Sequence, residues 1–229
     1  MDKRTYYTAV GNFRKKTSSL GHSYPVVVIN RREYMMDLQE MAVWTALCWR
    51  LLDFSQLQNK YEILARGLQP TRTLESCVDR LKTRGLIASG SGETDFDALY
   101  DLLCGLYVIP LCEDPFLRFI SFIKLVFLRH VPIEKAKELF RKDNPTDEEA
   151  QIMALSRQAL LSTAELIKCM EVGATDISTD TKLLDALYSD SETNCENICY
   201  FMQNAANKVP VIMAVANLYL RKQIIFERL

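Results

Sequence analysis

TLESCVDRLKTRGLI, residues 73–87, contains a helix, the end of that helix and the start of a strand. Apolar residues at i, i+3, i+4 and i+7 share one face of an α-helix, and here they are Leu74, Cys77, Val78 and Leu81. Gly85 suits the left-handed conformation in which helices commonly end, and residues 86–87 can begin a strand. The segment therefore predicts an amphipathic helix that turns a polar, basic side outward.

Two more helices are predicted before this segment, and each begins with a capping box, a polar N-cap residue followed three positions later by Glu or Gln. Asp37 to Glu40 opens a helix that we expect to end near Leu52, and Ser55 to Gln58 opens the second. After a turn at residues 67–70, Thr71 or Thr73 can cap the third helix. Three helices in this order, followed by a strand, are typical of a helix-turn-helix.

The strand after Gly85 predicts a β-hairpin wing of unusual form. Residues 89–92, SGSG, are interpreted as a loop, and residues 107–111 as the returning strand. Between them, residues 94–97 resemble a new helix start, so the hairpin is expected to contain a helical insertion. This insertion is acidic, because residues 91–113 contain five Asp and Glu and no Lys or Arg.

From residue 113 onward the sequence predicts helices only. Residues 1–24 are expected to form a loose basic arm before a short strand at 26–29, and the helical part is expected to begin near residue 113. We therefore predict a mainly α (α+β) protein with a winged-helix domain at 1–113 and an all-α domain at 114–229. The apolar surface of residues 119–127 should pack on other helices or on a second subunit. Charged substitutions at Phe127 or Tyr219 should then yield monomers.

The ending Val78-x-x-Leu81-x-x-x-Gly85-Leu86-Ile87 resembles that of winged helix-turn-helix transcriptional regulators of the MarR and PadR kinds, over roughly residues 25–112. The resemblance implies a bacterial, DNA-binding regulator that acts as a homodimer, with its third helix in the major groove. A small-molecule or protein effector is a further partner that it implies. The acidic insertion departs from this pattern, in which the wing tip carries basic residues.

On that geometry, the start of the recognition helix contacts base edges while neighbouring cations contact phosphates. The candidates for base contact are Arg72, Thr73 and Ser76. The candidates for phosphate contact are Arg80, Lys82 and Arg84, with Lys60 and Arg66 from the preceding helix. Residues 1–90 favour such a role because they hold fourteen Lys and Arg against eight Asp and Glu. Glu75 and Asp79 oppose it, because they lie on or beside the same face.

The alternative is a protein–protein interaction module that does not bind DNA. Winged helices also serve as docking folds, and the acidic insertion carries an apolar stripe of Phe96, Tyr100 and Leu103 that could be a docking edge. The sequence leaves both classes open.

Enzymatic chemistry is not indicated. The chain has two histidines, and no nucleotide-binding, serine-hydrolase or zinc-protease motif is present. Its seven cysteines contain no C-x-x-C pair, so we expect reduced, buried thiols, no metal and no cofactor. The N-terminus lacks the apolar segment of a signal peptide, and no run is long enough to span a bilayer. We therefore expect a cytoplasmic protein without a membrane partner.

Overall fold

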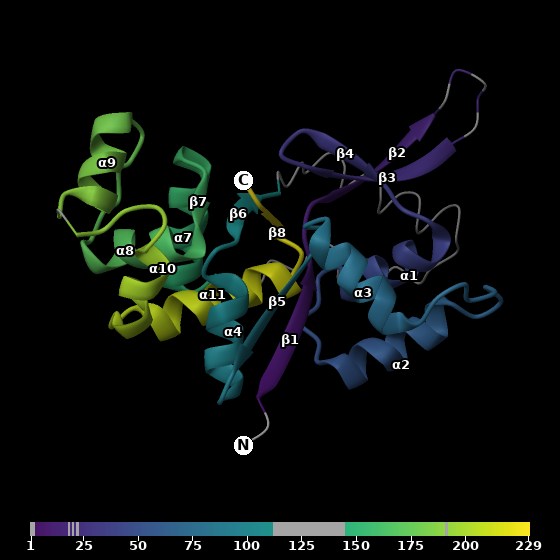
Figure 1. Cartoon of the computed structure of the whole chain (residues 1–229). Coiled ribbons are helices and arrows are strands. Elements are labelled where there is room, and N and C mark those ends of the chain that lie inside the picture. Colours follow the sequence, from purple (N-terminus) through teal and green to yellow (C-terminus); the bar gives the residue numbers. More distant parts are fainter. Residues whose placement is uncertain (1–2, 18, 20, 22, 112–144, 191) are drawn as a thin grey trace, which may run out of the picture.

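A computed structural model describes residues 3–17, 19, 21, 23–111, 145–190 and 192–229 (Figure 1). A ribbon of two long antiparallel strands, β1 (Arg4–Ala9) and β5 (Ile87–Gly92), runs through the middle of the molecule. Helices α1 to α3 and a small sheet lie on one side of it, and the helices that follow β5 lie on the other (Figure 1). The described residues thus form an α+β fold with small antiparallel sheets.

The first three-stranded sheet consists of β2 (Asn12–Thr17), β3 (Ser23–Ile29) and β4 (Arg32–Met35), in the order β2-β3-β4. It lies partly in residues that we expected to be a loose arm, because β2 and the start of β3 fall within residues 1–24, as does β1. The strand predicted at 26–29 forms the rest of β3. Asn30 and Arg31 form the turn between β3 and β4 with φ values of 45° and 62°. Two central residues with positive φ are characteristic of a two-residue hairpin turn whose twist matches that of its strands.

The three expected helices are present, as α1 (Leu38–Leu47), α2 (Phe54–Leu64) and α3 (Leu74–Thr83). The capping box at Asp37 and Glu40 is confirmed, and Thr73 is the N-cap of α3. The second helix starts earlier than predicted, because Asp53 rather than Ser55 caps it and pairs with Gln56.

The predicted wing is wrong. Strand β5 pairs with β1, whereas β6 (Tyr107–Pro110) belongs to another sheet, so the two do not form a hairpin. The helix between them, α4 (Asp95–Leu103), packs directly on β5. Gly90 permits this packing, because a Cβ atom there would lie 2.0 Å from the backbone nitrogen of Leu102. The glycines that we interpreted as a loop therefore lie in a strand covered closely by a helix.

The all-α prediction for the C-terminal part is also wrong. β7 (Leu161–Ser162) and β8 (Ile224–Glu227) flank β6 in an antiparallel sheet of order β7-β6-β8. The helical elements of this part are α7 (Asp147–Gln158), α8 (Thr163–Glu171), α9 (Asp180–Tyr188), α10 (Ile198–Phe201), the 3-10 helix η3 (Met202–Asn204) and α11 (Lys208–Leu220). The domain boundary near residue 113, the apolar surface at 119–127 and Phe127 lie outside the described residues.

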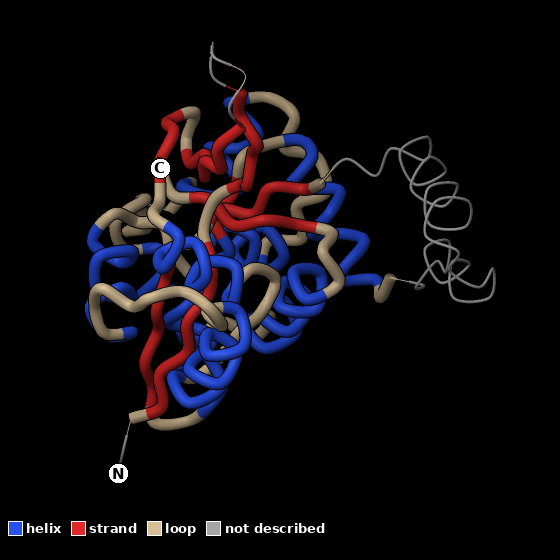
Figure 2. Tube along the Cα trace, turned by 90° about the vertical axis from the view of Figure 1, so that its right-hand side faces the viewer, coloured by secondary structure: helices blue, strands red, loops and turns tan. Residues whose placement is uncertain are grey.

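Segments from both ends of the chain share one hydrophobic core, with the sheets β2–β4 and β6–β8 near one end of the β1–β5 ribbon (Figure 2). Tyr219 of α11 is 1% exposed, and its hydroxyl accepts hydrogen bonds from Thr8 Oγ1 and from the Trp49 N–H, both at 2.9 Å. Tyr219 is therefore a core residue and not the surface contact that we expected. None of the described helices has the length and apolar character needed to cross a bilayer.

Candidate functional site

Three arginines of the α3 segment converge on one buried carboxylate. Arg80 Nε and Arg84 Nη1 each donate to Glu40 at 2.9 Å, one to each oxygen, and Arg72 Nη1 lies 3.7 Å from it. Arg72 also pairs with Asp37 at 2.5 Å. The Glu40 side chain is only 2% exposed, whereas that of Arg80 is 55% exposed. We call these five residues the arginine cluster.

The cluster follows from how α1 and α3 begin and pack. Asp37 and Glu40 occupy the N-terminus of α1, where the helix dipole favours negative charge. Arg80 and Arg84 are one turn apart on α3, so both reach the same carboxylate. Burial raises the pKa of Asp37. Hydrogen bonds from the Glu40 N–H and from Arg72 lower it by more, so the pKa of Asp37 lies below its ordinary value. The hydrogen bond to Asp37 in turn raises the pKa of Arg72.

The predicted DNA-contacting residues therefore do not form one free cationic face. Arg72, Arg80 and Arg84 are engaged by acids. The Thr73 hydroxyl caps α3 by accepting from the Ser76 N–H at 3.2 Å. The three remaining candidates, which are exposed, are Lys60, Arg66 and Lys82.

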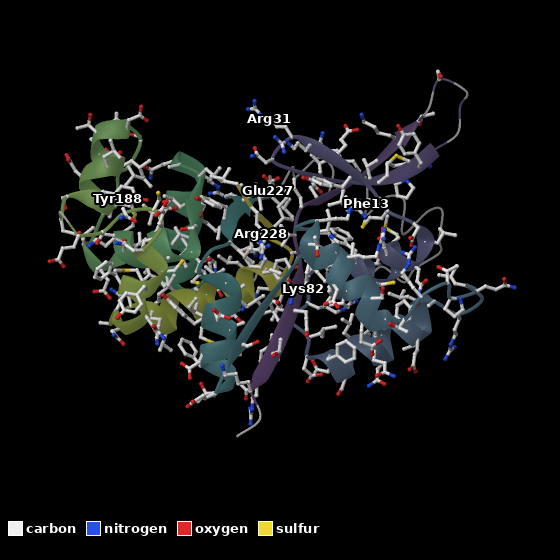
Figure 3. The ribbon with its side chains drawn as sticks, viewed as in Figure 1. Phe13, Arg31, Lys82, Tyr188, Glu227 and Arg228 are labelled. Atoms are coloured by element: carbon white, nitrogen blue, oxygen red, sulfur yellow. The ribbon has the colours of Figure 1, made fainter. Side chains whose placement is uncertain are left out.

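Lys60 faces a different part of the surface, a groove that is shared with Trp44 and Trp49. Lys82 lies on α3 itself, and Figure 3 labels it. A hollow of about 570 Å³ follows α3 and is lined by Ser76, Asp79, Arg80, Thr83 and Arg84. The structure thus brings Ser76, Arg80 and Arg84 together, and separates them from Lys60.

Strand β4 ends beside this face of α3. Arg84 Nη2 donates a hydrogen bond to the Met35 carbonyl, which joins the last residue of β4 to α3. Two apolar side chains here face solvent, because Met35 is 68% exposed and Leu38 is 70% exposed. An exposed apolar pair beside a cluster of arginines is a combination that a binding surface would need.

β4 is also an edge strand, since none of the other described strands pairs with its outer side. The two-residue turn makes Arg32 a hydrogen-bonded partner of Ile29, and the alternation of an antiparallel ladder makes Tyr34 the next such residue. The N–H and C=O groups of Glu33 and Met35 therefore point away from β3. The hydrogen bond from Arg84 to the Met35 carbonyl agrees with this, because it shows that the carbonyl points away from β3.

Sequence reasoning missed both parts of this site. Glu40 was recognised as a capping residue but not as the partner of α3 arginines, and β4 was not assigned. The available signal for β4 was the apolar run at 26–29 followed by Asn30, which tolerates positive φ, and then by REYM at 32–35.

Two further expectations concern the acidic helix and metals. Tyr100 is 6% exposed and Leu103 is fully buried, so these two residues of the predicted stripe pack inside the protein and offer no docking edge, while Phe96 is partly buried against the same core. Within the part of the chain that the structure describes, no group of three or more His, Cys, Asp or Glu side chains could hold a metal ion.

Comparisons with known proteins give no relatives. No protein family model matches the chain, and neither a curated protein nor a solved structure is significantly similar to it.

Proposed function

We propose that this protein is a recognition module that binds an extended segment of a partner protein along β4. The observation that carries the proposal is the outer edge of β4, with which no other described strand pairs, beside the arginine cluster. Extended peptides commonly bind by adding a strand to an exposed sheet edge, where main-chain hydrogen bonds give affinity and side-chain contacts give specificity. The outward N–H and C=O groups of Glu33 and the N–H of Met35 would supply the main-chain bonds, since the Met35 carbonyl already accepts from Arg84.

The arginine cluster favours an acidic partner segment. It contains three guanidinium groups and two carboxylates, so its formal charge is +1. In the described contacts, Arg80 uses only Nε for Glu40, which leaves its two terminal nitrogens for another carboxylate. Met35 and Leu38 favour apolar side chains nearby. The expected ligand is therefore an extended segment in which acidic and apolar residues alternate.

DNA binding through α3 is supported less well. A duplex would have to attract arginines that Glu40 and Asp37 already hold, with Asp79 in the same hollow. Carboxylates close to phosphates weaken the salt-dependent part of affinity. Exposed Lys82 and Arg66 are the residues through which a duplex could still bind, so DNA is included as an outcome of the test.

The test begins with a random linear peptide library displayed on phage and selected on the purified protein. Enriched peptides are synthesised, and their affinities are measured by fluorescence anisotropy. We expect acidic–apolar sequences that bind wild type, and a loss of about ten-fold or more with Arg80→Ala, but little change with Lys82→Ala.

The Glu33→Pro and Glu33→Ala pair tests strand addition. Both variants lose the ion pair with Lys16, but only proline removes the outward N–H, and neither removes a bond to β3. Binding should be lost with Glu33→Pro and kept with Glu33→Ala. Equal affinities would show that β4 is not the site. Salt-sensitive binding of a random DNA duplex that Lys82→Ala and Arg66→Ala weaken would favour the DNA-binding class instead.

A further inference from the structure

A second surface, separate from β4, has the features of a ligand site. It is a groove of about 820 Å³ between β2, the end of α1, α2 and the C-terminal elements α11 and β8. Its large apolar side chains are Phe13, Trp44, Trp49, Ile63, Leu64, Leu220 and Ile225. Four of these are unusually open to solvent, with exposures of 48% for Phe13, 55% for Ile63, 45% for Leu64 and 49% for Leu220. Figure 3 labels Phe13, which lies on β2 and lines this groove.

The two tryptophans are held with their polar atoms already satisfied. Trp44 Nε1 donates to the Val10 carbonyl at 3.1 Å, and Trp49 Nε1 donates to the Ile224 carbonyl at 3.3 Å. The half-buried Trp49 ring therefore offers carbon surface to the groove and not a hydrogen-bond donor, whereas Trp44, which is 3% exposed, contributes a buried wall. Trp49 also has a φ of 53°, a conformation that a bulky residue rarely adopts and that concentrates at functional sites.

The charges around the groove have a single sign. The charged residues that line it are Arg50, Lys60 and Lys222, and no acidic side chain of the described residues lines it. Lys222 Nζ lies 5.5 Å from the centre of the Trp49 ring, and Arg50 Nη1 donates to the Ala46 carbonyl at 3.0 Å. The Lys60 side chain makes no hydrogen bond or ion pair with the described part of the chain. An anion is therefore the complementary ligand.

We propose that this groove binds an amphipathic carboxylate, an elongated apolar molecule with one anionic end, such as a medium- or long-chain fatty acid. Its volume lies in the range of small-molecule sites, roughly 300–1,000 Å³. An apolar lining with a few cations matches one acyl chain and one carboxylate. It matches a peptide less well, because a peptide backbone needs several hydrogen-bonding partners. The apolar body lies against the tryptophans, and the carboxylate pairs with Lys60 or Lys222.

Tryptophan fluorescence tests this directly, because the chain has two tryptophans and both line the groove. Wild type is titrated with dodecanoate below its micelle concentration, and with dodecanol and dodecyltrimethylammonium as neutral and cationic ligands of equal chain length. We expect saturable binding of one dodecanoate, with about ten-fold weaker binding of dodecanol and weaker binding still of the cation. Dodecanoate should also raise the melting temperature, since it binds the folded state, whereas detergent-like unfolding would lower it.

The double variant Lys60→Gln, Lys222→Gln should lose about ten-fold in affinity for dodecanoate while its affinity for dodecanol stays unchanged. Lys82→Gln, on α3 and away from the groove, is the matched control. Equal binding of all three ligands, or an unaltered dodecanoate affinity in the double variant, would overturn the proposal. A wild-type dimer that Ile63→Asp dissociates in light scattering would also overturn it, because the groove would then be an interface between two copies.

Discussion

Glu40→Gln is the sharpest test of the arginine cluster. Glutamine keeps the shape of the side chain and can still accept at the capping box, but it removes the charge that holds Arg80 and Arg84 at 2.9 Å. Removing one partner of a buried ion pair typically costs about 3–5 kcal/mol. That figure must be reduced here, because the side chains of Arg80 and Arg84 are 55% and 29% exposed and water can solvate them once released.

We therefore expect Glu40→Gln to lower the free energy of unfolding by about 2–3 kcal/mol. For a chain of this size each kcal/mol lowers the melting temperature by about 2–4 °C, which gives a drop of about 4–12 °C. Urea unfolding and thermal unfolding, both followed by circular dichroism, measure these two quantities. Glu62→Gln, at an exposed position of α2, is the control and should change stability by less than about 0.5 kcal/mol. If the two variants unfold alike, Glu40 does not anchor α3.

Three other substitutions test separate parts of the fold. Burial raises the pKa of Asp37 but its hydrogen bonds lower it more, so the folded pKa lies below the ordinary value of 3.8. The stabilisation from Asp37 is therefore present above about pH 4 and is lost as pH falls through the folded pKa, so Asp37→Asn should flatten the pH dependence of urea stability below about pH 4. Gly90→Ala should cost about 3 kcal/mol or more in urea unfolding because its Cβ would meet α4, whereas Gly105→Ala meets nothing within 4 Å and should be neutral. Tyr219→Phe leaves the Trp49 N–H without its acceptor, and calorimetry should show a loss of about 1–3 kcal/mol.

The sequence was sufficient to predict the elements whose signals are local. An N-cap at Thr73 and apolar residues at helical spacing located α3, and Asp37 with Glu40 located α1. Strand partners were not predictable in the same way, because pairing depends on contacts between distant residues. β5 was assigned to its neighbour β6, while its actual partner β1 lies about eighty residues earlier. Residues 89–92 were wrongly interpreted as a loop, because glycine occurs both in loops and in strands that another element approaches closely.

At the site, too, local features were predictable and contacts between distant residues were not. The positive charges of α3 and their helical spacing were correctly described, but whether they are free depends on Glu40, about forty positions earlier. A carboxylate at a helix N-terminus has a sufficient local explanation in the capping box, so nothing in the sequence indicated its second role. Only packing of α3 against the start of α1 makes that partner available.

The arginine cluster favours peptide over DNA on energetic grounds. Nonspecific DNA affinity comes largely from cations that release counterions from phosphates. Cations already neutralised by a buried carboxylate contribute little of this, since a duplex must compete with Glu40 for them. A peptide carboxylate needs only one guanidinium fork, and Arg80 keeps its two terminal nitrogens while the bond at Nε fixes its position. A fixed guanidinium loses little conformational entropy on binding, so under the proposed function the contacts that disfavour DNA at α3 would favour a peptide carboxylate beside the outer edge of β4.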